Sequence, residues 1–409
     1  MRIVYLHQYF KTPDMAGGTR SYEMAKRLVQ WGHEVHIVTS STDDDGFVNG
    51  WRHEVIDGIN VHWLSVPYNN SMGFIRRLRA FCRFAFSAAT KASSIPADLV
   101  FASSTPLTIA LPAVFASRKQ GVPMVFEVRD LWPTVPIALG VIKNPLLCFL
   151  AKKLEAFAYR NSTRVIALSQ GMADGVVEAG FPSENVSVIP NSSDLELFDP
   201  SCAVPSKFRE QYPYLPSGPL VLYPGTLGKV NGIGYLVDIA DEMMKINSEI
   251  SFVVIGDGIE RSIVEKKAEA CDVLGRNFFI LDAMPKKMLV DAFHDSSLIV
   301  SFVIDVPELE ANSANKFFDA LAAFKPIGIN HGGWQKDVIE QKEVGLYLSR
   351  DANFAANSIA LFLSDTEKFE KVCANAGAVA KLEYSRDMLA RKLEGILIEA
   401  LTDVRELND

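Results

Sequence analysis

The sequence has few cysteines, and none of them stands at a spacing in which cysteine usually does chemistry. Its 409 residues contain five cysteines, which are scattered and form no CxxC pair. An odd number of isolated thiols is typical of a reducing compartment and argues against a disulfide framework or a zinc site. The seven histidines form no HExxH pattern. We therefore expect no bound metal.

Long apolar runs are missing as well. No run approaches the 18 residues of a membrane-spanning helix, and the opening stretch MRIVYLHQYF is typical of a strand rather than a signal peptide. These absences predict a cytoplasmic protein. The net charge of -8 argues against a general nucleic-acid binder. A hydrophobic content of 48% with 22% charged residues fits a globular chain of two or three domains.

Short apolar strands alternate with helical stretches along the whole chain. This alternation predicts an α/β protein with parallel, doubly wound sheets. A Pro-rich and Ser-rich break, FDPSCAVPSKFREQYPYLPSGP, separates two such series. We expect Rossmann-like domains over 1–195 and 196–383, with a last helix at about 384–409 packing on either. Ligands bind at the carboxyl ends of such strands, so two facing domains would form a cleft. The predicted strands are RIVYLH, VHIVTS, INVHWLSV, DLVFAS, PMVFEV, RVIALS, VSVIP, LVLYPG, SFVVIG, NFFILD, LIVSFV and PIGIN.

Two glycine-rich loops follow predicted strands. Glycine lets a backbone approach a phosphate closely, and exposed N–H groups at a helix start favour an anion. Neither loop has the spacing of a P-loop or a dinucleotide fingerprint, and a loop of this kind taken alone is more often a plain strand-to-helix turn. The candidates for phosphate binding are Gly17 and Gly18 in KTPDMAGGTR, and Gly225, Lys229, Asn231 and Gly232 in YPGTLGKVNG.

A third candidate is the stretch NSANKFFDALAAFKPIGIN, which begins a predicted helix. Lys316 and Asp319 lie three residues apart, so they are neighbours on the first helical turn. One interpretation is a solvated ion pair at the positive end of the helix dipole. The other is a donor clamp, in which Lys316 and the amides near Asn315 hold a diphosphate while Asp319 holds a diol.

Charged residues also end the buried strand in FEVRDLWPTVPIALG. Glu127, Arg129 and Asp130 stand beside Trp132, and this combination suits a sugar or substrate cleft at a strand's carboxyl end. A structural ion pair that caps the next turn explains the same residues. The sequence leaves both interpretations open.

The stretch GFIRRLRAFCRFAFSAATKAS, residues 73–93, has five basic residues, no acid and several interleaved phenylalanines. A basic amphipathic helix of this kind can lie on an anionic bilayer. A helix that faces the core and leaves a basic edge in water fits the pattern equally well. LLCFLAKKLEAFAYR could extend the same face.

Taken in order, these motifs resemble the retaining, GT-B fold glycosyltransferases of family four. The pieces are GGTRSYEMAKRLVQWGHEVHIVTS, VRDLWP, LEAFAYRNSTRVIALSQGM, VSVIPNSSDLELFDP, YPGTLGKVNG, IGDG and NKFFDALAAFKPI. VRDLWP and NKFFDALAAFKP are similar to the branch that builds bacterial surface polysaccharides, including L-fucosamine transferases. The resemblance implies two facing Rossmann-like domains: the N-terminal one would bind the acceptor, and the C-terminal one the nucleotide sugar.

The resemblance also implies roles for individual residues. Asp319 matches the second acid of the family's E-x7-E motif, which grips the ribose hydroxyls, whereas Ala311 stands at the first acid and leaves Glu310 nearby. The implied catalytic residue is Asp130, which would orient the acceptor. The implied donor-binding residues are Gly17, Gly18, Gly225, Lys229, Asn231, Gly232, Glu310, Asn315, Lys316 and Asp319, and the implied acceptor-binding residues are Arg20, Arg129 and Asp130.

The activity implied by the resemblance is transfer of a sugar from a UDP-sugar to a polyprenol-diphosphate-linked saccharide, with retention of configuration. The product would belong to O-antigen or capsule synthesis, an N-acetylated amino sugar such as L-fucosamine is one candidate donor, and no cofactor is needed. The enzyme would be cytoplasmic, with a peripheral membrane contact through residues 73–93. Two alternatives remain open: a nucleotide-sugar epimerase or hydrolase of the same fold, and a two-domain binding protein without catalysis.

Overall fold

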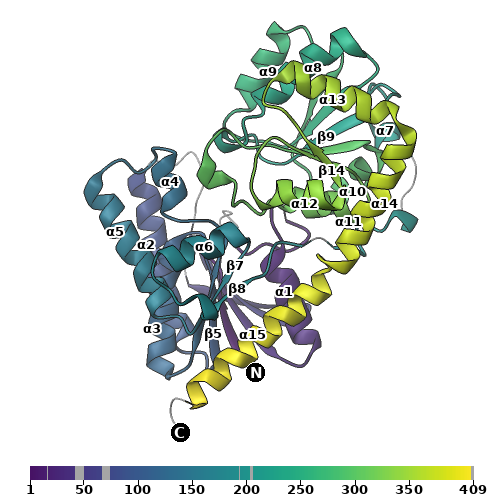
Figure 1. The fold of residues 1–409 in the computed structure, drawn as a ribbon. Coiled ribbons are helices and arrows are strands. Elements are labelled where there is room, and N and C mark those ends of the chain that lie inside the picture. The colour runs from purple at the N-terminus through teal and green to yellow at the C-terminus, as the bar shows by residue number, and fades with distance from the viewer. Residues whose placement is uncertain (16, 42–49, 67–73, 193, 203–205, 407–409) are drawn as a thin grey trace. The chain divides into compact units, whose positions relative to one another are not determined.

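The computed structural model describes the chain from Met1 to Asp409 except residues 16, 42–49, 67–73, 193, 203–205 and 407–409. The chain divides into two compact units (Figure 1). Unit 1 comprises residues 1–12, 19–190 and 387–409, and unit 2 comprises residues 13–18 and 191–386. The last helix therefore belongs mostly to the unit that contains the N-terminus.

Unit 1 is built on an eight-stranded sheet of order β3-β4-β2-β1-β5-β6-β7-β8. All neighbouring strands are parallel except β3 and β4, which form an antiparallel pair at the edge. Its strands are β1 (Arg2–Leu6), β2 (Glu34–Ser41), β3 (Trp51–Ile56), β4 (Ile59–Ser65), β5 (Leu99–Ser103), β6 (Met124–Val128), β7 (Arg164–Ala167) and β8 (Val186–Val188).

Helices connect these strands in the β-helix-β manner that a parallel sheet requires. α3 contacts both α2 and α5, so these three helices form one layer. The helices of unit 1 are α1 (Arg20–Gln30), α2 (Phe74–Ala92), α3 (Ala110–Gln120), α4 (Thr134–Ala138), α5 (Pro145–Arg160), α6 (Gln170–Glu178) and α15 (Arg386–Glu406), the last beginning at the final residue of unit 2. Short 3₁₀ turns lie at Leu107–Ile109 and Ser183–Asn185.

Unit 2 contains a six-stranded parallel sheet of order β11-β10-β9-β12-β13-β14. Its strands are β9 (Leu220–Pro224), β10 (Ser251–Ile255), β11 (Phe278–Leu281), β12 (Leu298–Ser301), β13 (Ile327–Ile329) and β14 (Gly345–Tyr347). Its helices are α7 (Lys207–Gln211), α8 (Gly234–Ile246), α9 (Arg261–Ala270), α10 (Lys286–Asp295), α11 (Asn315–Ala322), α12 (Trp334–Lys342), α13 (Ala352–Ser364) and α14 (Thr366–Leu382), with 3₁₀ turns at Pro200–Cys202, Lys229–Asn231 and Pro307–Leu309.

Both faces of the unit 2 sheet are buried. Leu222 on β9 packs into one apolar cluster, while its neighbours Val221 and Tyr223 pack into a second cluster on the opposite face. Because successive side chains of a strand point to opposite faces, this division means that helices cover the sheet on both sides. All five residues of β9 are buried, as a central parallel strand requires.

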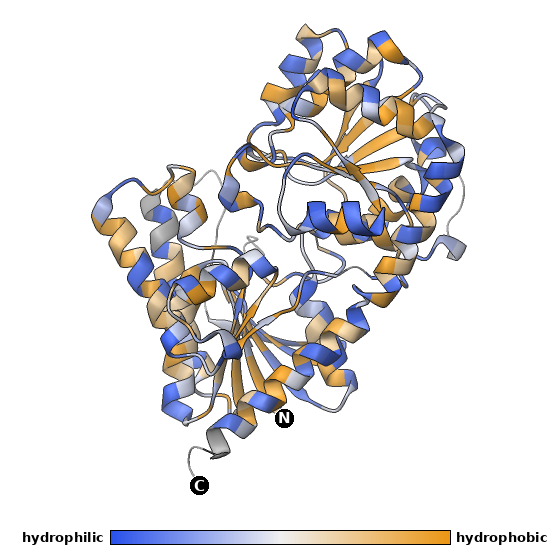
Figure 2. Ribbon diagram, viewed as in Figure 1, coloured by the Kyte–Doolittle hydropathy of each residue, from blue (hydrophilic) through white to orange (hydrophobic). Residues whose placement is uncertain are grey.

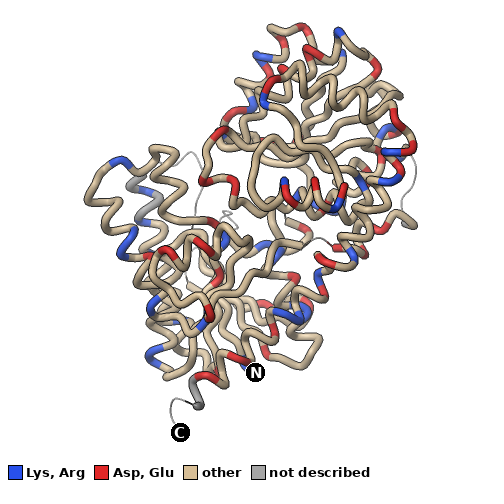
Figure 3. Tube along the Cα trace, in the orientation of Figure 1, with Lys and Arg blue, Asp and Glu red and all other residues tan. Residues whose placement is uncertain are grey.

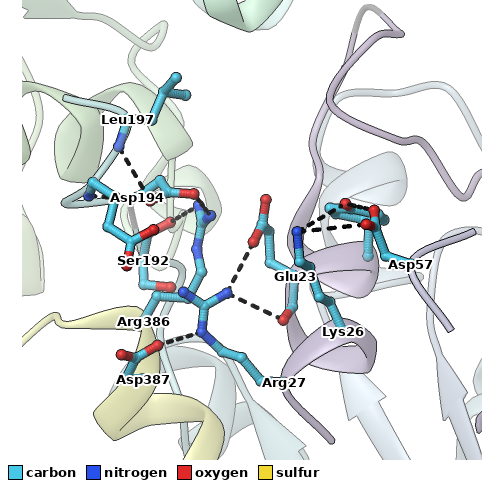
Figure 4. A network of polar contacts seen from close by, with 11 residues as sticks. Glu23, Lys26, Arg27, Asp57, Ser192, Asp194, Leu197, Arg386 and Asp387 are labelled. Carbon is cyan, nitrogen blue, oxygen red and sulfur yellow. Dashed lines mark hydrogen bonds and ion pairs between the residues drawn. The ribbon is translucent and has the colours of Figure 1, made fainter. Parts of the chain in front are cut away.

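α15 crosses from one unit to the other at its first two residues (Figure 4). Arg386, still in unit 2, donates to Asp194 at 2.8 Å, and Asp387, the first residue of α15 in unit 1, binds Arg27 on α1. Farther along, Arg391 stacks on the ring of Trp31 at 3.5 Å from its centroid. These contacts fix the last helix on unit 1.

The fold class predicted from the sequence is confirmed: both units contain a parallel sheet between helices. Every predicted strand is present. The prediction missed two strands at sheet edges, β3 and β14. β3 is WRHEVI, whose middle four residues are exposed, so it lacks the apolar run that marks the central strands.

Candidate active site

The order of the unit 2 strands reverses at one point of the sheet. The chain proceeds from β9 through β10 to β11 on one side, and from β12 through β13 to β14 on the other. The loops that follow β9 and β12 therefore leave in opposite directions, and ligands of doubly wound folds bind at such a switch point. Gly225, Lys229, Asn231 and Gly232 lie in the loop after β9, and Glu310 and α11 lie in the connection after β12.

Lys316, in the first turn of α11, reaches back to the end of β9. Its Nζ lies 4.1 Å from the centroid of the Tyr223 ring. A Cβ atom at position 225 would stand only 3.1 Å from the same Nζ, and the φ angle of 150° at Gly225 favours glycine as well. The sequence candidates Gly225 and Lys316 are thus brought together, and glycine at 225 is what lets the ammonium approach.

The Lys316 ammonium has no counter-ion. Among the residues that the structure describes, no carboxylate or carbonyl oxygen accepts a hydrogen bond from Nζ, and the Tyr223 ring is its one recorded partner. Burial disfavours the charged form and lowers the pKa of Lys316 to about 7. An anion placed beside Nζ would compensate this charge. The position therefore favours the binding of an anion.

The start of α11 adds backbone donors to this ammonium. The N-cap residue, Ala314, has no side chain that could cap the first N–H groups. Those groups carry the positive end of the helix dipole. The Phe317 N–H already donates to the Ala314 carbonyl oxygen at 3.1 Å, so the N–H groups of Asn315 and Lys316 are the ones placed to meet an anion. Asn191 fixes the approach to the helix, since its Nδ2 donates to the carbonyl oxygen of Ser313 at 2.6 Å. The helix start is therefore held in place while its own donors stay open.

Asp319 does not pair with Lys316. Its Oδ1 accepts from Lys286 on α10 at 2.8 Å, and both side chains are largely buried. The ion pair that the sequence left open between Lys316 and Asp319 is therefore absent, because α10 supplies another partner. The second carboxylate oxygen of Asp319 has no hydrogen-bond donor within the described part of the chain.

The other candidates in the loop after β9 mostly shape the loop. Asn231 Nδ2 donates to the carbonyl oxygen of Thr226 at 2.7 Å, and the Tyr223 hydroxyl donates to the same oxygen at 2.9 Å. Gly232 has a φ of 57°, and a Cβ there would stand 3.0 Å from Ile304. Lys229 is exposed at the loop's outer turn. The loop is thus closed on itself and presents Lys229 to solvent.

The loop after β13 carries a residue that the sequence reasoning missed. His331 is 1% exposed, its Nδ1 hydrogen-bonds to the carbonyl oxygen of Gly332 at 2.9 Å, and its Nε2 is buried without a partner. Burial lowers the pKa of His331, so the ring is neutral, Nδ1 carries the proton and Nε2 is a free acceptor. The Glu310 carboxylate lies against Gly332, where a Cβ would stand 2.8 Å from Oε1. The only sequence signal was the polar NHGG after a buried strand.

In unit 1, Arg20 is enclosed rather than offered to a ligand. Its guanidinium lies 2.8 Å from the Glu127 carboxylate, and the two side chains are 3% and 1% exposed. It also donates to the carbonyl oxygens of Ile189 and Pro190. Ser103 donates to the other oxygen of Glu127 at 2.6 Å. This arrangement links α1, β5, β6 and the end of unit 1, so Arg20 and Glu127 form the buried structural pair that the sequence had left as an alternative.

Arg129 begins a second chain of contacts at the carboxyl ends of β1 and β6. It lies 3.1 Å from His7 Nε2, whose Nδ1 lies 2.9 Å from the Ser21 hydroxyl. A guanidinium only donates, so His7 accepts through Nε2 and holds its proton on Nδ1. Burial and the Arg129 charge keep the pKa of His7 well below its usual range. His7 therefore orients Arg129 and cannot act as a cationic acid.

Asp130 stands next to this chain and remains open to solvent. Thr105 donates to its Oδ2 at 3.0 Å, and the surrounding protein raises the pKa of Asp130 by desolvation. Arg129 and Asp130 thus present one donor group and one acceptor group at the same strand end.

The first glycine-rich loop falls in a different unit from the one predicted. Residues 13–18 group with unit 2, and Asp14 in this loop forms an ion pair with Lys287 on α10 at 2.7 Å. Gly17 has a φ of 133°, a conformation that favours glycine, and Gly18 precedes Thr19, the N-cap residue of α1.

In the described ranges, no group of three or more His, Cys, Asp or Glu side chains is placed to hold a metal ion. None of the helices in that part of the chain combines the length and apolar character needed to cross a bilayer.

The chain matches the model of the glycosyl transferase 4-like domain over residues 16–192. It is 24% identical over 300 residues to the putative colanic acid biosynthesis glycosyl transferase WcaI of Escherichia coli, with 69% of this chain and 73% of the relative covered. It is 23% identical over 293 residues to the alpha-D-kanosaminyltransferase of Streptomyces kanamyceticus, with 69% and 72% covered. Together with the two-sheet fold, these matches support a GT-B glycosyltransferase of family four.

A solved structure supports the fold of this glycosyltransferase over its whole length. HepE of Anabaena, in complex with UDP and glucose, superposes with a TM-score of 0.71 at 18% sequence identity, and covers 98% of this chain and 100% of its own. At this level of identity the superposition establishes the architecture of the glycosyltransferase, while its ligands remain those of HepE.

Proposed function

We propose that the protein transfers a sugar from a UDP-sugar to a polyprenol-diphosphate-linked saccharide of a bacterial surface polysaccharide, with retention of configuration. The observation that carries the donor half is the Lys316 ammonium, which is partly buried at the N-terminus of α11 and has no counter-ion among the residues that the structure describes. A nucleoside diphosphate supplies the anion that this position lacks.

The reaction breaks the bond between the sugar's anomeric carbon and the diphosphate oxygen. Negative charge grows on the leaving diphosphate, and fixed donors aimed at that charge lower the barrier without rearranging. Lys316 and the first N–H groups of α11 take this role, with Lys229 as a second cation at the loop after β9. Because Gly225 has no side chain, the diphosphate can approach Lys316 beside the backbone of this residue.

The remaining donor contacts are assigned to carboxylates and the buried imidazole. The unpaired oxygen of Asp319 accepts from a ribose hydroxyl, while its other oxygen stays on Lys286. Glu310 and the free Nε2 of His331 are acceptors for hydroxyls of the sugar ring. Gly17 and Gly18 give backbone access on the phosphate side.

On the acceptor side, a saccharide hydroxyl attacks the anomeric carbon from the face that the diphosphate leaves. The new bond joins the acceptor oxygen to that carbon, and the acceptor's proton passes to the departing phosphate oxygen. Asp130 accepts a hydrogen bond from the attacking hydroxyl and orients it, and Arg129 binds the acceptor. Arg20 supports this side through Glu127 rather than by contact with substrate.

The comparisons support the proposed substrates by analogy. HepE was solved with UDP, which favours a uridine nucleotide as donor. The printed role of WcaI in colanic acid biosynthesis favours a surface polysaccharide as product. An N-acetylated amino sugar such as L-fucosamine is the first donor sugar to test.

Calorimetry with UDP and turnover of UDP-sugars test the proposal together. Lys316→Ala is expected to raise the barrier by about 2 to 4 kcal/mol and to weaken UDP binding, because one donor to the leaving group is lost. Lys266→Ala removes an exposed lysine of α9 and serves as the matched control with normal turnover. Equal UDP affinity and turnover in Lys316→Ala and the wild-type protein would refute the proposal.

Incubation of donor without acceptor separates the alternatives. A transferase leaves the UDP-sugar largely intact until a lipid-linked acceptor is added. An epimerase or hydrolase changes it at once, and a binding protein changes it in neither case. Nuclear magnetic resonance of the anomeric proton of the product reports whether configuration is retained.

A further inference from the structure

Unit 2 contains a surface cavity that lies away from the candidate active site. Its volume is about 440 Å³, within the range of sites for small molecules, and its lining includes Ser206, Arg209, His294, Asp295, Phe324 and Lys325. Figure 2 shows that the strands of this sheet are largely apolar, and the polar groups of the cavity come in part from the segments that lead into β12 and β13. Because neighbouring parallel strands begin at the same edge of a sheet, the cavity and the candidate donor loops lie at opposite edges.

Arg209, on the short helix α7, is a cation of this cavity without a carboxylate partner. Its guanidinium donates to the carbonyl oxygen of Pro216 and, at 2.7 Å, to that of Gly218. These carbonyl groups accept hydrogen bonds but carry no net charge. No carboxylate in the described part of the chain forms an ion pair with the guanidinium. Partial burial lowers the pKa of Arg209, so the folded protein disfavours this charge.

Asp295, the last residue of α10, is the acidic member of the lining, and both of its oxygens are already occupied. Oδ1 accepts from the Ser206 N–H at 2.9 Å. Oδ2 accepts from the N–H groups of Phe208 and Arg209 at 2.9 and 3.2 Å. Three amide donors therefore stabilise this carboxylate, which holds the start of α7 and leaves the side chain of Arg209 without a counter-ion.

Lys325, in the segment between α11 and β13, is a second cation of this kind. Its Nζ donates to the carbonyl oxygen of His294 at 2.7 Å, and no carboxylate among the described residues pairs with it. Burial lowers the pKa of Lys325. The ring of His294 has a buried Nε2 without a hydrogen-bond partner in the described structure, and burial together with the Lys325 charge lowers its pKa, so the ring is neutral at pH 7. The cavity thus combines two cations and a neutral imidazole with one compensated carboxylate.

Phe324 has an unusual backbone conformation for a bulky residue. Its φ of 55° is left-handed, and it follows the C-cap residue of α11, a position at which glycine is the usual residue. The ring is fixed against α14, because a Cβ at Gly377 would stand 2.7 Å from it and Lys381 Nζ lies 4.8 Å from its centroid. Strained residues persist where the surrounding structure holds them, and they are common at ligand sites. Phe324 therefore gives the cavity a fixed aromatic wall.

Two further acids near His294 have other partners. Asp291 pairs with Lys207 at 2.8 Å, and Asp199 accepts from the Ser201 N–H at 2.9 Å. Figure 3 shows residues of both signs along α14, so the surface around the cavity is not uniformly basic. The pairing distinguishes the cavity from this surface, because its carboxylate is compensated whereas its two cations are not.

We propose that this cavity binds a small organic anion with a flat apolar body. A carboxylate or phosphate head accepts hydrogen bonds from Arg209 and Lys325, and the apolar body lies against the Phe324 ring. An anion is favoured over a neutral ligand because it compensates two charges that the protein leaves without carboxylates. The cavity is separate from the donor residues, so this inference does not rest on the proposed glycosyl transfer.

Calorimetry of the full chain with benzoate and with phenyl phosphate tests the proposal, and benzyl alcohol is the neutral comparison. At least one of the two anions is expected to bind about tenfold more tightly than benzyl alcohol, and the anion that binds identifies the head group. Acetate and inorganic phosphate carry the same head groups without a ring. They are expected to bind at least about threefold more weakly than the matching aromatic anion, because the contact with Phe324 is lost.

Substitutions in the cavity locate the binding. Lys325→Met keeps the apolar stem but removes the charge, so it is expected to weaken binding of the anion about tenfold. Lys325→Arg keeps the charge and should retain most of the affinity. Phe324→Gly removes the ring at a φ that glycine adopts freely, and it is expected to weaken binding about fivefold. The matched control Lys266→Met changes an exposed lysine of α9 and should bind as the wild type does.

Titration of Lys316→Ala separates this cavity from the donor site. The variant is expected to bind the anion as the wild type does, and thermal unfolding confirms that each variant is folded. The proposal would be overturned if neither anion bound the wild-type protein, if Lys325→Met bound as tightly as the wild type, or if Lys316→Ala lost the binding. Titration with UDP reports on the proposed function alone, so the two proposals can fail separately.

Discussion

Arg20 in unit 1 and Lys316 in unit 2 are cations with opposite surroundings. Both stand in the first turn of a helix that follows a parallel strand. Arg20 is closed in by a carboxylate and two carbonyl oxygens, whereas Lys316 faces an aromatic ring and has no oxygen partner in the described structure. A buried cation with its partners in place holds a fold together, and one without them is poised to bind an anion.

The largest expected effect concerns the closed pair. Arg20→Met leaves the Glu127 carboxylate buried without its cation and should lower the free energy of unfolding by about 3 to 5 kcal/mol. Urea denaturation measures this. Arg2→Met is the control, because Arg2 and Glu34 form an exposed pair whose loss should change the stability little.

A second substitution sharpens the interpretation of Arg20. Glu127→Met in the Arg20→Met background removes the stranded charge and should restore part of the lost stability. If Arg20→Met and Arg2→Met destabilise equally, Arg20 is not the enclosed structural cation that the geometry indicates.

The open cation should respond in the opposite direction. Lys316→Met removes a partly buried charge that has no partner among the described residues, and it is expected to raise the free energy of unfolding by roughly 1 to 3 kcal/mol at pH 6. The gain should shrink at higher pH: the folded-state pKa of Lys316 is lowered to about 7, so its penalty is complete below pH 7 and fades toward pH 10. A loss of stability at pH 6 would mean that Lys316 has a partner after all.

The smallest expected effect is the pH dependence of UDP binding. A bound diphosphate favours the charged form of Lys316, so above pH 7 binding must take up a proton. Affinity should therefore fall from pH 7 to pH 9, by at most about tenfold per unit. Calorimetry in buffers of different ionisation enthalpy measures the proton directly. Lys316→Met should flatten this dependence, and a wild-type profile that is already flat would argue against diphosphate contact with Lys316.

The sequence could predict features that depend on residues near one another in the chain. The alternation of buried strands with amphipathic helices gave the two parallel sheets, and LVLYPG and SFVVIG were recognisable because central parallel strands are apolar throughout. β3 and β14 were not predicted, because β3 is largely exposed and β14 is only three residues long. The motifs also placed Gly225 after a strand and Lys316 in the first turn of a helix, and the structure has both there.

Pairing between distant residues was beyond the reach of the sequence. Lys316 and Asp319 are helix neighbours, yet Asp319 binds Lys286 and Lys316 turns to Tyr223. Glu127 lies within β6 and Arg129 lies just after the strand ends, and Glu127 meets Arg20 while Arg129 meets His7. His331 was missed because a single histidine in a loop belongs to no sequence motif. Its distinguishing feature, a buried Nε2 without a hydrogen-bond partner, is visible only in the folded structure.

The sequence by itself determined the two-sheet architecture and the loops in which polar groups gather, because hydrophobic periodicity and glycine positions are local properties. Only the tertiary structure decided which charge is neutralised and which is left open, since that depends on a helix and a strand more than a hundred residues apart in the chain, as with Arg20 on α1 and Glu127 on β6. Electrostatic energy depends on distance in space and on burial, and the order of residues specifies neither until the chain has folded.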